Sequence, residues 1–175
     1  MSTNNMLLTI GAFVILTTIL HNVYGILATT GDDIAEAQDM ILANTIAASY
    51  LEIAQGLAFD HVTDTSDIAI GKAALLTDPY ALGPDDSDED SVKNFTDFDD
   101  FNGLVLEKQA TGSDKRFKTL FRVSYVDPNN VDAVSTIRTF VKRIDLKVWR
   151  SFPPSKGAIT DTLRMSLAMG YFHFD

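Results

Sequence analysis

The chain has 175 residues and a formal net charge of −10, and its charges fall into blocks. Residues 1–31 contain no Asp, Glu, Lys or Arg, residues 32–100 contain 17 acidic and 2 basic residues, and residues 101–175 contain 7 acidic and 12 basic residues. This balance makes nucleic acid a poor partner, because phosphates are bound by positively charged surfaces. The absence of cysteine excludes disulfides, thiolate metal ligands and a cysteine nucleophile.

The first predicted element is a hydrophobic helix over residues 1–28, apolar from residue 6 onward. At ~1.5 Å per residue, residues 6–28 would span roughly 34 Å, about the thickness of a bilayer core. The chain begins Met-Ser-Thr-Asn-Asn, without Lys or Arg, and the apolar run is not followed by a clear small-x-small pattern. These features favour a retained transmembrane or filament-core helix over a cleaved signal or a buried helix of a soluble domain.

A second, amphipathic helix is predicted over residues 29–58, continuing the first. Gly25 and Gly31 are the candidate positions of a helix break, because glycine disfavours the helix. Apolar residues then recur on one stripe at helical spacing, namely Ile34, Ala37, Ile41, Ala48 and Leu51. If continuous, residues 6–58 would form a helix roughly 80 Å long, which is more than one small domain can bury. Its first half must then be covered by lipid or by other copies of the chain.

Residues 59–103 read as an acidic, irregular loop. Pro79, Gly83 and Pro84 interrupt any regular pattern, and the acidic run at residues 85–90 has little to bury. Phenylalanines at the end of this segment are expected to anchor it on the domain: Phe95, Phe98 and Phe101.

Residues 104–175 show the period-two alternation of half-buried strands. Alternating runs at residues 117–125, 140–148 and 163–171, with a short run near residues 104–107, predict about four strands. Their short connections indicate antiparallel pairing. The predicted fold class is therefore α+β: a long N-terminal helix packed on a C-terminal antiparallel sheet, which forms the head domain.

Oxygen donors gather just before this sheet. Asp97, Asp99, Asp100 and Asn102 are candidate calcium ligands, although their spacing does not match an EF-hand, and residues 85–90 could also collect cations. Asn94, in Asn-Phe-Thr, has the pattern of an N-glycosylation site. The sequence contains no Gly-x-Ser-x-Gly, phosphate-loop or His-Glu-x-x-His motif, so no enzymatic activity and no cofactor other than calcium is predicted.

This order of elements resembles the type IV pilin superfamily, which includes pilus subunits, minor pilins and type II secretion pseudopilins. In residues, the likeness rests on two stretches. Residues 139–149 place Lys-Arg before an alternating strand, as in minor pilin-like proteins, and residues 98–103 resemble a segment found ahead of that sheet. The family carries a glutamate at its fifth mature position, where it is thought to pair with a neighbour's terminal amine. If Met1 is the mature start, Asn5 stands at this position, and it can accept a hydrogen bond but cannot neutralise an amine.

The resemblance implies a structural subunit of a homopolymeric filament, held in the inner membrane before assembly and displayed at the cell surface afterwards. The residues expected in its helical core are Met1, Asn5, Leu7, Leu8, Phe13, Val14, Leu16, Leu20 and Tyr24. A monomeric membrane-anchored binding module and a minor pilin or pseudopilin of a secretion machine are the alternatives. Adhesion, motility and secretion are all compatible with this sequence.

Overall fold

The computed structural model describes residues 3–69, 71–154 and 162–172. The chain divides into two compact units, Met1–Asp39 and Met40–Asp175. Helix α1, Thr3–Gln55, begins in the first unit and ends in the second. The first unit consists of this helix alone, and the second contains every other helix and strand of the described chain.

Helix α1 runs without interruption through Gly25 and Gly31, so the helix break considered at these two glycines is absent. A glycine costs a helix only about 1 kcal/mol relative to alanine, which good helix formers on either side can offset. The hydroxyls of Thr29 and Thr30 also fold back onto the helix. They donate to the carbonyl of Ile26 at 2.9 and 2.8 Å.

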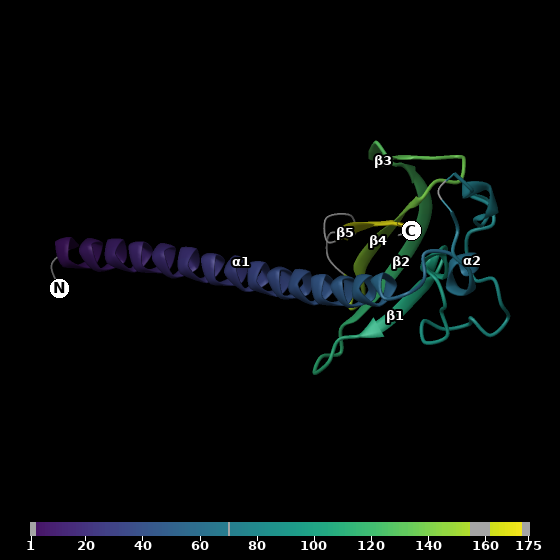
Figure 1. Cartoon of the computed structure of the whole chain (residues 1–175). Coiled ribbons are helices and arrows are strands. Elements are labelled where there is room, and N and C mark those ends of the chain that lie inside the picture. Colours follow the sequence, from purple (N-terminus) through teal and green to yellow (C-terminus); the bar gives the residue numbers. More distant parts are fainter. Residues whose placement is uncertain (1–2, 70, 155–161, 173–175) are drawn as a thin grey trace. The chain divides into compact units, whose positions relative to one another are not determined.

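The sheet of the second unit is antiparallel throughout (Figure 1). Four strands pair in the order β1 (Val105–Gln109), β2 (Arg116–Asp127), β4 (Val141–Phe152) and β5 (Leu163–Gly170). A fifth, β3 (Asn130–Val134), turns back on the end of β2. The predicted α+β fold is confirmed. The sequence did not reveal β3 because it is short and almost wholly exposed, and so lacks a buried alternation.

The core lies between one face of this sheet and the last turns of α1. Alternate residues of β2 and β4 are buried there, including Phe117, Phe121, Ile144, Leu146 and Val148. The helix contributes Ala43, Ile46, Ala47, Leu51 and Ala54. Of the stripe predicted from the sequence, only Leu51 belongs to this face. The alanines decide which side faces the sheet, because their small side chains let the helix approach it closely.

The segment between α1 and β1 contains α2 (His61–Thr65) and two short 3₁₀ helices, η1 (Ala73–Leu75) and η2 (Phe98–Phe101). Phe95, Phe98 and Phe101 are all buried in the main core, as the sequence predicted. The segment also has a small core of its own, formed by Phe59, Ile68 and Leu76 together with Tyr125 of β2. It is therefore folded against the sheet, although most of it is neither helix nor strand.

Candidate functional site

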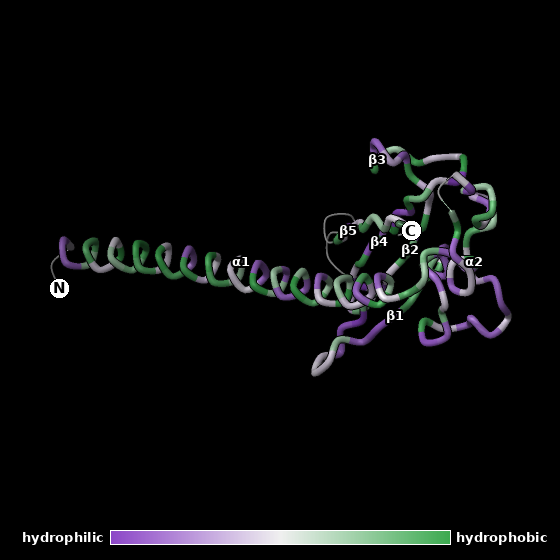
Figure 2. Tube along the Cα trace, in the orientation of Figure 1, coloured by the Kyte–Doolittle hydropathy of each residue, from purple (hydrophilic) through white to green (hydrophobic). Residues whose placement is uncertain are grey.

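The apolar segment of α1, residues 6–28, presents its side chains to the outside. No described residue of α1 before Met40 is buried, and Figure 2 shows hydrophobic residues along the whole of this segment. The core residues predicted here are strongly exposed: Leu7, Leu8, Phe13, Val14, Leu16, Leu20 and Tyr24. Asn5 is exposed as well, and Met1 lies outside the described residues. A helix that is apolar around its circumference is typical of a membrane span or the core of a bundle.

The threonine hydroxyl groups of this segment are satisfied within the helix. Thr9, Thr17 and Thr18 donate to carbonyls one turn earlier, at 2.8, 2.8 and 2.9 Å. The segment therefore offers few polar groups that would resist transfer into lipid or into a dry helix bundle. Helix α1 is long and apolar enough to cross a membrane.

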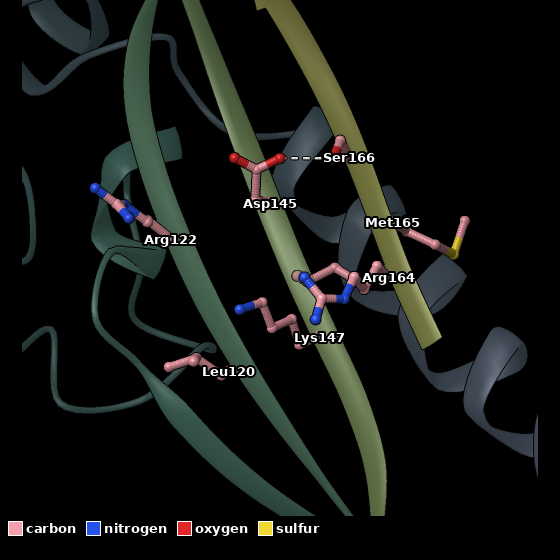
Figure 3. A pocket seen from close by; sticks show the side chains of 8 residues that line it. Leu120, Arg122, Asp145, Lys147, Arg164, Met165 and Ser166 are labelled. Carbon is pink, nitrogen blue, oxygen red and sulfur yellow. Dashed lines mark hydrogen bonds between the residues drawn. The ribbon is translucent and has the colours of Figure 1, made fainter. Parts of the chain in front are cut away.

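A basic patch, defined by Arg122, Lys147 and Arg164, lies on the outer face of the sheet. These three side chains come from β2, β4 and β5 and line one shallow hollow (Figure 3). Lys147 stands directly opposite Arg164 in the strand register. Like charges in that position repel each other, so the patch is suited to an anionic group from elsewhere.

Asp145 lines the same hollow and stands directly opposite Arg122 in the strand register, but its two oxygens also accept hydrogen bonds from other side chains. Its Oδ2 accepts from Arg143 at 2.9 Å, and its Oδ1 accepts from Ser166 at 2.6 Å, the bond drawn in Figure 3. Among the described residues, Lys147 and Arg164 form no ion pair. As far as the described part of the chain goes, the two cations are therefore open to an anionic partner.

The acidic run at residues 85–90 is held by one of its own members. Glu89 is buried, and its carboxylate accepts from the backbone N–H groups of Asp85 and Asp86 at 2.8 and 3.0 Å and from the Thr96 hydroxyl at 2.8 Å. Burial by itself raises the pKa of Glu89, but these donors outweigh it and the pKa is lowered. The other acidic residues of the run are exposed.

Behind this run lies a buried acidic cluster, defined by Asp60, Asp97, Asp99 and Asp100. All four residues are at most 1% exposed. Lys142 of β4 is fully buried among them. Its Nζ donates to Asp60 Oδ2 and to the Phe59 carbonyl, each at 2.8 Å, and to Asp99 Oδ1. One lysine therefore pairs with two of the four aspartates.

Asp60 is the best satisfied member of the cluster. Its side chain accepts from the N–H groups of Val62 and Thr77 and from the Tyr125 hydroxyl, which lies 3.2 Å from Oδ2. Burial alone would raise the pKa of Asp60, but the charge and hydrogen bond of Lys142 and the two N–H donors lower it. The pKa of Tyr125 is raised, first by burial and then by the negative charge of Asp60.

The residues predicted as calcium ligands make different hydrogen bonds in the structure. Asp97 is the N-cap of η2 and accepts from the Asp99 N–H at 2.8 Å, while Asp100 accepts from the N–H groups of Thr96 and Asp97 at 2.9 and 3.0 Å. Asp97, Asp99 and Asp100 thus lie together. Asn102 does not join them as an oxygen donor, because its Oδ1 accepts from a backbone N–H of β2.

Three oxygens of the cluster have no hydrogen-bond donor among the described residues: Asp97 Oδ2, Asp99 Oδ2 and Asp100 Oδ1. Burial, reinforced by the charges of Asp99 and Asp100, raises the pKa of Asp97 to about 9. Burial also raises the pKa of Asp100. The cluster therefore carries more negative charge than its one lysine can balance, and it needs protons or a cation.

Sequence reasoning did not identify Asp60, His61 or Lys142. The burial of Lys142 could have been predicted, because it lies at the same alternate positions of β4 as the buried Ile144, Leu146 and Val148. A lysine in the core phase of a strand requires a buried anion. Asp60 and His61 left no comparable signal, since caps of short helices are often Asp and isolated histidines are common.

Asn94 of the glycosylation pattern is exposed, and its Nδ2 donates to the Asp88 carbonyl at 2.7 Å and to Asp90 Oδ1 at 3.2 Å. Its modification stays a prediction.

No known protein family, curated protein or solved structure matches the chain.

Proposed function

We propose that the chain is the structural subunit of a filament like a type IV pilus, and that it polymerises through the apolar segment of α1. The observation that carries this proposal is the exposure of large apolar side chains along residues 6–28, combined with threonine hydroxyls that are satisfied inside the helix. A surface of this kind needs a cover. Before assembly the cover is the inner membrane, and in the filament, at the cell surface, it is the same segment of neighbouring copies.

The energetic argument favours helix packing as the main source of cohesion. Fully burying one large apolar side chain contributes about 1.5–3 kcal/mol, and this segment exposes more than a dozen of them. An exposed ion pair contributes about 0–1 kcal/mol. Contacts between the acidic run of one copy and the basic patch of the next would therefore set the register of neighbours rather than hold the filament together.

The head domain supports a structural role for α1 beyond residue 39. The alanine-rich face of Met40–Gln55 is buried against the subunit's own sheet, so this part of the helix is already covered. The apolar segment, in contrast, has no buried residue and is left for lipid or for other copies. This division of one helix into a covered part and an uncovered part is what a filament subunit with a helical core requires.

The test compares wild type with a Phe13→Ala, Leu16→Ala double variant. Both side chains are more than half exposed, and alanine keeps the helix and its affinity for membranes while it removes apolar bulk. We expect wild type to form helical filaments in electron micrographs once detergent is removed, and the double variant to form fewer and shorter ones while it still fractionates with membranes. Ile137→Ala, on an exposed loop of the head domain, is the matched control and should assemble like wild type.

Two results would contradict the proposal. One is wild-type protein that stays monomeric under every condition tested, which would favour a membrane-anchored binding module. The other is unchanged assembly of the double variant.

A further inference from the structure

We infer that His61, Asp85 and Asp97 bind a divalent metal ion of the Zn²⁺ and Mn²⁺ class, at the mouth of the buried acidic cluster. The three residues come from separate parts of the chain: the first turn of α2, the acidic run and the N-cap of η2. Each places a nitrogen or carboxylate oxygen within 4.8 Å of those of the other two. This site is distinct from the filament surface and does not depend on it.

The distances suit a small divalent ion. Ligand atoms that each lie about 2.1 Å from Zn²⁺ in tetrahedral geometry are roughly 3.4 Å apart. His61 Nδ1 lies 3.9 Å from Asp85 Oδ2, which is wider than this spacing and too long for a direct hydrogen bond. A small movement of His61 or Asp85 would close the site around an ion, because both side chains are partly exposed and therefore free to adjust.

Asp97 is the observation that points to a ligand. It is fully buried, and its Oδ1 is occupied by the N–H of Asp99. Its Oδ2 has no donor among the described residues, although burying a carboxylate oxygen without a partner is costly. A metal ion at the mouth of the cluster gives this oxygen a partner.

The charges around the site demand the same compensation. Lys142 pairs with Asp60 and Asp99, so Asp97 and Asp100 have no ion pair with another described residue. A divalent ion between Asp85 and Asp97 offsets this excess of negative charge.

The donor set decides which ion fits. Ca²⁺ takes oxygen ligands only, whereas imidazole nitrogen combined with carboxylates suits Zn²⁺ and Mn²⁺. This assignment differs from the calcium set expected from the sequence, which included Asn102 and did not include His61. A bound ion would join α2, the acidic run and η2, and so would hold the irregular segment on the head domain.

The experiment titrates chelator-treated, full-length protein in detergent with ZnCl₂, MnCl₂ and CaCl₂ by isothermal calorimetry, with thermal unfolding as a second readout. We expect one Zn²⁺ site per chain that raises the unfolding temperature. Both His61→Ala and Asp97→Asn should weaken it at least tenfold. Asparagine caps a helix as well as aspartate does, so Asp97→Asn keeps the cap of η2, and His61 is exposed enough for alanine to be tolerated. His21→Ala and Asp88→Asn are matched controls at exposed positions and should bind like wild type.

Three outcomes would overturn the inference. The first is the absence of Zn²⁺ and Mn²⁺ binding, which would mean that protons alone neutralise the cluster. The second is Zn²⁺ binding that both site variants retain, which would mark adventitious surface binding. The third is Ca²⁺ binding that is tighter than Zn²⁺ binding and insensitive to His61→Ala.

Discussion

Replacing Lys142 by methionine is the sharpest perturbation of the head domain. Methionine matches the length of the lysine stem but carries no charge, so the change leaves Asp60 and Asp99 buried without their shared cation. Removing one partner of a buried ion pair lowers the free energy of unfolding by about 3–5 kcal/mol, mainly because the remaining charge stays buried without a counter-charge. The total stability of a domain is about 5–15 kcal/mol, so the variant should lose a large part of it.

The assay is reversible urea unfolding of the full-length chain in detergent at pH 7, followed by the fluorescence of Trp149. Lys147→Met changes the same residue type on the same strand at an exposed position, and should stay within about 0.5 kcal/mol of wild type. Adding Asp99→Asn to Lys142→Met should recover part of the loss, because it removes one stranded charge. A cost below about 1 kcal/mol for Lys142→Met, or no recovery in the double variant, would refute the reasoning.

Two further predictions concern the acidic run and the basic patch. Because the folded-state pKa of Glu89 is lowered, its contribution to stability is present above the unfolded pKa of about 4.5 and is lost as the pH falls through the folded value. Glu89→Gln should therefore lower the free energy of unfolding by about 1–3 kcal/mol at pH 7 and by progressively less at acid pH. Thermal unfolding in the presence of a chelator measures this loss. Asp88→Asn is the control and should show no such pH-dependent loss. Combining Lys147→Gln with Arg164→Gln should reduce the salt sensitivity of filament assembly in light scattering; an unchanged salt dependence would mean that the basic patch makes no electrostatic contact between copies.

Local sequence pattern was sufficient for the long helix and for four of the five strands of the sheet. The charge-free apolar run, the helix formers that follow it and the period-two strands each depend on residues close together in the chain. The phenylalanines at positions 95, 98 and 101 were also readable, because aromatic residues in an otherwise polar segment have to be buried somewhere. The short β3 was not readable, since its residues are exposed on both faces.

Hydrophobic periodicity alone was not enough to predict which face of α1 packs against the sheet. Several stripes of this helix are apolar, and the one chosen from the sequence contained the large side chains of Ile34 and Ile41. Only the packed structure shows that the small Ala43, Ala47 and Ala54 face the sheet, because the choice depends on the shape of the surface opposite.

The sequence by itself determined that this chain has a long apolar N-terminal helix, an acidic middle and an antiparallel sheet, since those properties are local. Only the tertiary structure decided which charges meet. Lys142 reaches Asp60 across 82 positions, and Asp97 approaches His61 although they belong to different helices. Such pairings depend on how the segment between α1 and β1 folds onto the sheet. Low-dielectric burial then turns ordinary acidic residues into a cluster whose charge has to be compensated by protons or by a cation.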